Sequence, residues 1–192
     1  MSDMTAALDR IVAHLRRLER GSPDRLQRGL SNRELASWEA KLPFALTREL
    51  EVIYQWRNGT RADPGDLLES LYMFPGFYFL SIEEAVETYQ QEQVNPEWLD
   101  GWFPVFANGG GDFYIVPCRP EKVADTVVIG WIHSEPDKIA EYESLTAMVE
   151  TLDACFREGA FYLNDEDMMD IDDDKHREIA NMFNPTIPEW QS

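Results

Sequence analysis

The stretch Trp102–Val116, WFPVFANGGGDFYIV, places two apolar runs on either side of three consecutive glycines. A phosphate-binding loop sets its glycines between a strand and a helix, so that the N-terminus of the helix faces the anion. Here a strand-like segment follows the glycines, and the stretch has neither the GxGxxG spacing nor the lysine of a Walker loop. Because Asn and Gly adopt positive φ readily in hairpin turns, we expect Asn108–Asp112 to join two antiparallel strands. The alternative is a loop that lets the backbone of a partner approach closely.

Beyond this stretch, the chain reads as helices, then mainly strands, then helices. Helical spacing of apolar residues, or a capping box at Ser31/Glu34 and at Ser81/Glu84, predicts helices near residues 8–18, 32–41, 46–54, 82–89, 145–156 and 173–183. Strand-like patterns occupy residues 102–106, 113–116 and 126–133. This order indicates an α+β domain and not a βαβ array.

The composition is strongly acidic, with 36 Asp and Glu against 17 Lys and Arg and a net charge of −19 over 192 residues. Residues 1–35 carry a net charge of +2, residues 36–163 carry −14 and residues 164–192 carry −7. Nucleic acids and anionic membranes are therefore poor ligands, because both need clustered Lys and Arg. A basic protein partner, or solubility alone, fits this charge better. The N-terminus lacks the apolar core of a signal peptide and no run of 18 apolar residues exists, so we expect a cytoplasmic protein.

The histidines and cysteines give no recognisable catalytic or metal-binding pattern. His14, His133 and His176 are far apart, and none belongs to an HExxH motif. We expect His14 on the polar side of its helix and His176 in an exposed segment, which leaves His133 as the one to follow. Cys118 and Cys155 are interpreted as buried thiols.

The acidic run at residues 164–174 resembles a calcium loop only in part. A loop that starts at Asp170 would have Lys175 in place of the required glycine and Asn181 in place of the closing glutamate. We therefore interpret the run as a solvated acidic turn before a helix, and we predict no metal site and no cofactor. The pairs Glu83/Glu84 and Glu141/Glu143 could suit glycoside hydrolysis, but such pairs arise by chance in so acidic a chain.

Several short motifs occur in a characteristic order along the chain. They are Leu42-Pro43, Leu46-Thr47, Tyr54–Gly59 (YQWRNG), Phe74-Pro75, Leu80–Ala85 (LSIEEA), Trp102–Phe106 (WFPVF), Gly110–Asp112 (GGD) and Ser144-Leu145. Over roughly residues 30–160 this order resembles the SUKH superfamily, in particular its Smi/Knr-like domain. The closing Asn184-Pro185 and Trp190 look like the tail of some bacterial members.

The resemblance implies an α+β domain with one central, mostly antiparallel sheet flanked by helices. It divides the chain into an N-terminal amphipathic helix (1–30), the SUKH-like domain (31–163) and an acidic extension with a short helix (164–192). No catalytic residue is inherited, and we expect structural roles for the motif residues Trp56, Asn58, Gly59, Trp102, Pro104, Gly110, Gly111 and Asp112. In particular, we expect Asn58-Gly59 to end a helix, the two tryptophans to anchor the core and Asp112 to bind loop amides.

The function that the resemblance implies is protein binding. Many bacterial members of this superfamily look like immunity proteins that neutralise a cognate toxin, often a nuclease, whereas fungal members are regulatory. We therefore expect a non-enzymatic immunity protein whose partner is a basic toxin domain. The alternatives are a regulatory scaffold without a toxin partner and a small hydrolase that uses an acid pair or His133.

Overall fold

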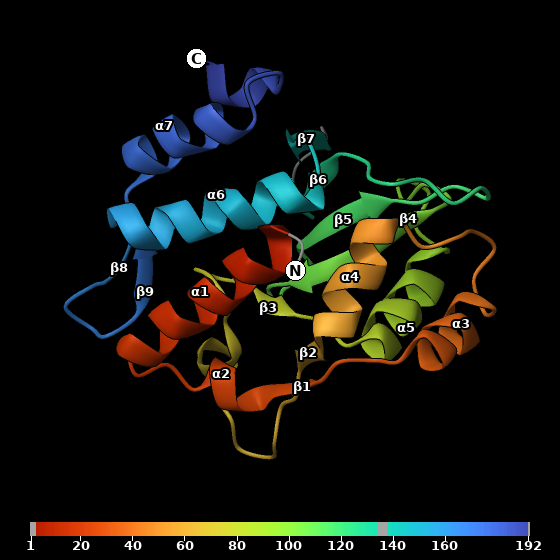
Figure 1. Cartoon of the computed structure of the whole chain (residues 1–192), viewed down its shortest axis with the longest axis horizontal. Coiled ribbons are helices and arrows are strands. Elements are labelled where there is room, and N and C mark those ends of the chain that lie inside the picture. Colours follow the sequence, from red (N-terminus) through yellow and green to blue (C-terminus); the bar gives the residue numbers. More distant parts are fainter. Residues whose placement is uncertain (1–2, 134–137, 192) are drawn as a thin grey trace.

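The computed structural model describes residues 3–133 and 138–191, and Figure 1 shows its elements. The α-helices are α1 (Asp3–Arg17), α2 (Ser22–Arg25), α3 (Asn32–Glu39), α4 (Arg48–Trp56), α5 (Ile82–Glu92), α6 (Leu145–Glu158) and α7 (Asp173–Phe183). The strands are β1 (Leu26–Arg28), β2 (Arg57–Thr60), β3 (Tyr78–Phe79), β4 (Trp102–Ala107), β5 (Phe113–Pro117), β6 (Val128–Trp131), β7 (Ile139–Tyr142), β8 (Phe161–Leu163) and β9 (Met169–Ile171). Two 3-10 helices, η1 (Leu68–Leu71) and η2 (Pro188–Gln191), complete this set.

The central sheet has five strands in the order β3-β4-β5-β6-β7, and each strand pairs antiparallel with its neighbour. Two small antiparallel sheets, β1-β2 and β8-β9, stand apart from it. The α+β class and the antiparallel central sheet predicted from the sequence are confirmed. Among the described helices, none combines the length and the hydropathy that a membrane span requires.

The glycine stretch forms the hairpin turn between β4 and β5, which confirms the prediction of a strand-to-strand connection. The two strands pair with Phe103 opposite Val116. Within the turn, Asn108 Oδ1 accepts hydrogen bonds from the amides of Gly110 and Asp112, at 2.7 and 3.0 Å. The glycines on either side of Gly110 have φ of 77° and 102°, a backbone conformation that side chains disfavour.

Two apolar clusters lie on opposite faces of the central sheet. Successive strand residues point to opposite faces, so the neighbours Trp102 and Phe103 join different clusters. The larger cluster fills the space between the sheet and the helices. The smaller cluster contains Trp98, Trp102, Ile115, Ile129 and Trp131. Its cover is the segment between α5 and β4, whose Trp98 indole donates to the Trp102 carbonyl at 3.1 Å.

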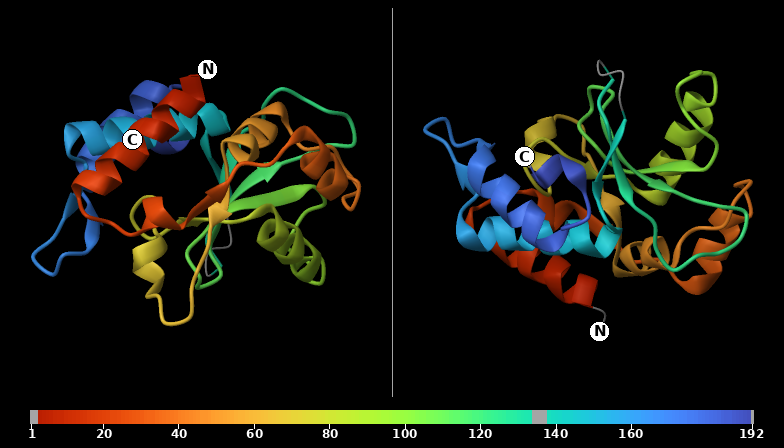
Figure 2. Two further views of the ribbon diagram at one scale, coloured as in Figure 1. Left: turned by 60° about the horizontal axis from the view of Figure 1, so that its bottom comes forward. Right: turned by 90° about the horizontal axis from the view of Figure 1, so that it is seen from above.

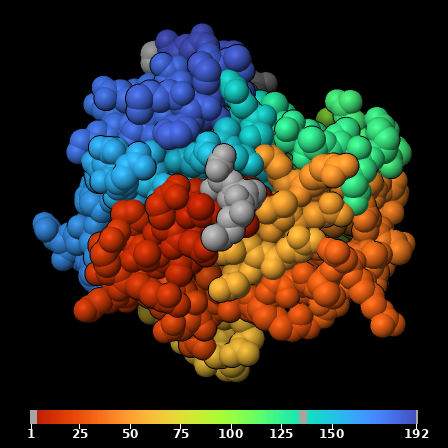
Figure 3. Space-filling view, viewed as in Figure 1, coloured from red at the N-terminus to blue at the C-terminus, as the bar shows by residue number. Residues whose placement is uncertain are grey.

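Helix α6 lies between α1 and α7 (Figures 1 and 3). All residues from Thr151 to Phe156 are buried, which requires cover on every side of the helix. The buried carboxylate of Asp153 pairs with Arg10 of α1 at 2.8 Å. At the other end, Glu49 of α4 accepts hydrogen bonds from the amides of Leu145 and Thr146, both at 3.0 Å, so one carboxylate satisfies two free N–H groups of the α6 N-terminus.

The C-terminal segment binds α6 and the outer strand β7. Asn184 is fully buried, and its Nδ2 donates to Thr151 Oγ1 at 3.0 Å while its Oδ1 accepts from the Glu143 amide at 3.0 Å. The Glu143 carboxylate accepts from the Thr186 amide at 2.7 Å. The Trp190 indole donates to the Glu141 carbonyl, and its ring contacts Tyr142 of β7. The segment thus covers an edge of the sheet whose backbone groups would otherwise be open.

Besides the position of His14, described below, three local expectations were wrong. Asn58-Gly59 does not end a helix: α4 ends at Trp56, Arg57 is extended, and both residues lie in β2. The acidic run is not a simple turn, because its residues Met169–Ile171 pair with β8 in a hairpin (Figure 2). His176 is half-buried, since its ring packs against Phe161 and Trp190, and this burial lowers its pKa.

Asn184→Ala should lower the free energy of unfolding by about 2–4 kcal/mol, because it leaves buried polar groups of Thr151 and Glu143 without their partner. Urea denaturation would measure the change. Asn181→Ala, at an exposed position of α7 just before Asn184, is the matched control and should change stability by less than about 0.5 kcal/mol. Equal stability of the two variants would contradict the role assigned to Asn184.

Candidate binding pocket

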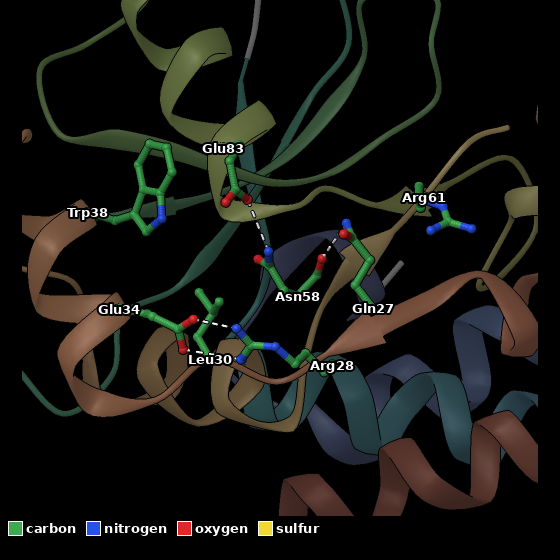
Figure 4. A pocket seen from close by; sticks show the side chains of 8 residues that line it. All are labelled: Gln27, Arg28, Leu30, Glu34, Trp38, Asn58, Arg61 and Glu83. Carbon is green, nitrogen blue, oxygen red and sulfur yellow. Dashed lines mark hydrogen bonds and ion pairs between the residues drawn. The ribbon is translucent and has the colours of Figure 1, made fainter. Parts of the chain in front are cut away.

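A pocket of about 380 Å³ lies between α3, the β1-β2 ribbon and the start of α5 (Figure 4). The side chains around it come from segments that are far apart in the sequence. They are Gln27, Arg28, Leu30, Glu34, Trp38, Asn58, Arg61 and Glu83. We call this site the Trp38 pocket.

Asn58 of β2 holds the two sides of the Trp38 pocket together. Its Oδ1 accepts from the amide of Ile82, the first residue of α5, at 2.9 Å, and its Nδ2 donates to Glu83 Oε2 at 2.9 Å. Its carbonyl accepts from Gln27 Nε2 at 3.0 Å. The side chain is thus a second N-terminal cap for α5, in addition to the capping box of Ser81 and Glu84.

Gly59 lets β2 come close to the start of α5. Its φ is 74°, and a Cβ at this position would lie 2.2 Å from the Ser81 nitrogen. Any side chain would therefore push α5 away from β2, in addition to straining the backbone. The Asn-Gly pair is explained by this one junction: the asparagine caps the helix and the glycine allows the approach.

Glu34 and Arg28 form the charged wall opposite Glu83. Glu34 accepts from Arg28 with both carboxylate oxygens and from the Ser31 amide at 2.8 Å. The hydrogen bonds from Arg28 and then from Ser31 lower the pKa of Glu34 to about 2, and the contact with Glu34 raises the pKa of Arg28. This carboxylate therefore stays charged at any physiological pH.

The remaining residues that line the pocket suit the binding of a side chain from another molecule. Leu30 is buried and Trp38 is half-buried, so the pocket has apolar surface beneath its charged groups. Lys41 lies 3.4 Å from the centroid of the Trp38 ring. Glu83 is exposed and is held by an amide and not by a cation, which leaves its negative charge available.

A second pocket, of about 320 Å³, lies beside the C-terminal half of α5. Its lining includes Phe44, Tyr89, Asp100 and the buried Cys118, and we call it the Phe44 pocket. Phe44 and Tyr89 pack edge to face with ring centroids 5.0 Å apart. Asp100 is the one charged side chain among the described residues that line it.

The structure places the other motif residues outside the Trp38 pocket. Trp56 is half-buried, and its indole donates to Asp9 of α1 at 2.8 Å. Trp102 lies in the smaller cluster and Pro104 is buried in β4. Gly110 and Gly111 lie in the hairpin turn, where Asp112 Oδ1 accepts from the His133 amide at 2.9 Å. Of the motif residues, the pocket contains Asn58 alone, and Gly59 is its neighbour in β2.

The remaining candidates for chemistry have structural contacts. Glu84 caps α5 and Glu143 holds Thr186, so one member of each acid pair serves the fold. Burial raises the pKa of both cysteine thiols to about 12, which leaves them protonated at neutral pH. His14 stacks on Phe156 at 5.7 Å and is half-buried, unlike the expected polar position. Within residues 3–133 and 138–191, no three His, Cys, Asp or Glu side chains converge as metal ligands would.

Sequence reasoning singled out some residues of the Trp38 pocket for structural roles, but it predicted no pocket and no partner-binding residue. The motif order indicated Asn58, and the capping boxes marked Glu34 and the start of α5. Gln27, Arg28 and Trp38 were missed, because their positions depend on how β1 pairs with β2 and where α3 packs. An amphipathic pattern could have marked Trp38 as apolar, but not as pocket lining.

The chain was compared with known protein families and with curated proteins. Residues 29–151 match the model described as the SMI1 / KNR4 family (SUKH-1). The match starts just before α3 and ends within α6, so it includes Asn58, Glu83 and the whole β4-β5 hairpin. No curated protein matches the sequence.

Gly59→Ala should destabilise the fold by about 3 kcal/mol or more, because the new Cβ meets the backbone of Ser81 and φ is positive. Gly110→Ala is the matched control, since its φ is not positive and its Cβ would meet only Asn108, at 3.4 Å. That change should cost less than about 1 kcal/mol. Thermal and urea unfolding of both variants would test the contrast, and a Gly59→Ala variant as stable as Gly110→Ala would contradict it.

Glu34→Gln should remove a stabilising effect that depends on pH. The ordinary pKa of this carboxyl is 4.5 and its folded value is about 2, so the unfolded chain takes up the proton first. The effect is fully present above about pH 5 and is lost as the pH falls towards about 2. The difference between the urea midpoints of the wild type and the variant should shrink over that window. Glu97→Gln, an exposed acid, is the control, and a difference that is constant with pH would exclude the effect.

Proposed function

Because the chain belongs to the SMI1 / KNR4 family (SUKH-1), we propose that it is a protein-binding module that acts as an immunity protein. In this role it binds a cognate toxin and blocks its activity. The family match supports the binding class, and the charge distribution supports the type of partner. The proposal gives no residue a catalytic role.

The distribution of charge along the chain carries the proposal. Residues 62–118 contain ten Asp and Glu and no Lys, Arg or His. This run includes η1, α5, the β4-β5 hairpin and the segments between them. The acids of this run would help to attract the basic groove with which a nuclease binds phosphates, and to cover it.

The two alternatives make different predictions. A regulatory scaffold would bind a partner without inhibiting a toxin. A hydrolase would need free acid pairs, whereas Glu84 and Glu143 are held in structural hydrogen bonds. The binding proposal further assumes the cytoplasm as the place of action and the division into residues 1–30, 31–163 and 164–192.

Co-expression with the product of the neighbouring gene would test the function. If that gene encodes a multidomain toxin, this chain should restore growth to cells that express the toxin domain, and the two purified proteins should co-elute in size-exclusion chromatography. A chain with Gly59→Ala is the control for folding. Unchanged toxicity and separate elution of the two wild-type proteins would exclude the immunity function.

The association rate of the complex should fall steeply with salt. Charge attraction accelerates encounter and is screened over about 8 Å at physiological ionic strength, whereas dissociation depends mainly on close contacts. Stopped-flow measurements between about 0.05 and 0.5 M salt would show this as a falling association rate with a nearly constant dissociation rate. An association rate that is unchanged over this range would remove the charge argument and leave the family match alone.

A further inference from the structure

We propose that the Trp38 pocket and the Phe44 pocket together form one docking groove along α5, and that the groove receives a basic segment of the protein partner. This inference rests on the proposed function, because it names the surface that the partner occupies. The partner segment carries Lys or Arg side chains next to a large apolar side chain.

The two pockets lie between the same pair of chain segments. In the Trp38 pocket, Trp38 of α3 lies across from Glu83 at the start of α5 (Figure 4). In the Phe44 pocket, Phe44 lies across from Tyr89 in the later turns of α5. From Trp38 to Phe44, and from Glu83 to Tyr89, each segment runs towards higher residue numbers. The two pockets therefore follow each other along α5.

The base of each pocket is apolar and suits an apolar side chain of the partner. Leu30 and Phe44 are buried and Trp38 is half-buried, so each pocket exposes a small apolar surface at its base. Beyond the last turn of α5, Val94 is 90% exposed and Leu99 is 55% exposed. Aromatic side chains, such as Trp38 and Tyr89 of the two pockets, are enriched at the core of protein interfaces.

The charges along the groove favour a cationic occupant. On the α5 side, Glu83, Glu87 and Asp100 are exposed, and no described ion pair includes any of them. Glu83 lines the Trp38 pocket and Asp100 lines the Phe44 pocket. Glu87 lines neither, but it shares the face of Glu83 because the two are four residues apart on one helix.

The cations on the opposite side are largely neutralised within the chain. Arg28 is paired with Glu34, Arg61 with Asp63 at 3.2 Å, and Lys122 with Glu39 at 3.1 Å and Glu51 at 2.6 Å. Lys41 is the exception, because it lies over the Trp38 ring and belongs to no described ion pair. A Lys or Arg from the partner would therefore meet negative charge without displacing an existing pair. A second copy of this chain, with a net charge of −19, would be repelled.

Peptide selection on the full-length chain would test the groove without knowledge of the partner. Random dodecapeptides displayed on phage would be selected on the wild type. We expect the selected peptides to combine Lys or Arg with a large apolar residue. In a nuclear magnetic resonance titration, a synthetic copy of a selected peptide should shift the resonances of Trp38, Glu83, Tyr89 and Asp100.

Charge reversal gives a matched pair of variants. Glu87→Lys with Asp100→Lys should weaken binding of the selected peptide at least about tenfold. Asp165→Lys with Glu166→Lys changes the net charge equally, but at the tip of the β8-β9 hairpin, far from α5 (Figure 2). That control should weaken binding less than about threefold. All four positions are exposed, and circular dichroism would confirm that both variants fold.

Several outcomes would overturn the proposal. The selection could yield no peptides above background, or peptides without basic residues. The resonance shifts could lie away from the groove, or both double variants could weaken peptide binding equally. Shifts of the same resonances on dilution without peptide would assign the groove to a second copy instead.

The failure of this proposal can be told apart from the failure of the proposed function. Growth rescue that persists in the Glu87→Lys, Asp100→Lys variant would reject the groove and leave the immunity function standing. Selection of basic peptides by a chain that never protects cells would support the groove and reject the immunity function.

Discussion

Three consecutive residues of β2 hold the start of α5, and much of the remaining structure depends on this junction. Asn58 caps the first amide of α5, Gly59 allows the backbones to meet, and Thr60 Oγ1 donates to the Phe79 carbonyl at 2.9 Å in the buried interior. Each buried hydrogen bond contributes about 1 kcal/mol net, and an unmet partner would cost more. The junction fixes α5 against the ribbon. It also fixes β3, because Phe79 is the last residue of β3 and lies three residues before the first residue of α5. The Trp38 pocket exists because β2 and α5 cannot separate there.

A second constraint lies at α6. The family match ends within this helix, but the helix and its packing continue beyond that point. The match stops at residue 151, yet the next five residues of α6 are buried as well. Their cover comes from α1 on one side and α7 on the other, joined through Asp153 and Asn184. A buried carboxylate without a cation would be strongly destabilising. Arg10 of α1 forms the shorter ion pair with Asp153, at 2.8 Å against 3.8 Å for Arg157 of α6 itself, so α1 stabilises this buried charge. The N-terminal helix and the acidic extension therefore complete the core that the family segment begins.

The sequence predicted most elements and little of their assembly. Capping boxes and helical periodicity located α3, α5 and α6, because these signals are local. The β4-β5 hairpin was predictable since its glycines and flanking apolar runs are adjacent. The ribbon β1-β2 was missed because Leu26–Arg28 has no periodic pattern and gains its partner from a strand about 30 residues away. The same reason explains the wrong end assigned to α4: Asn58-Gly59 is a helix-stop signal locally, and only the contact with α5 shows its actual role.

The acids of this chain fall into two groups with different consequences for binding. Glu34, Glu49, Glu84 and Glu143 accept backbone amides, so their charge is part of the fold. Glu87 and Asp100 cap no helix in the part of the chain described, and the cation-free run around them adds repulsion. Repulsion of this kind destabilises an isolated protein slightly and favours a complex in which a cationic surface neutralises it. The second group, concentrated along α5, is therefore charge that folding does not require, and it is the charge that the proposed docking groove would use.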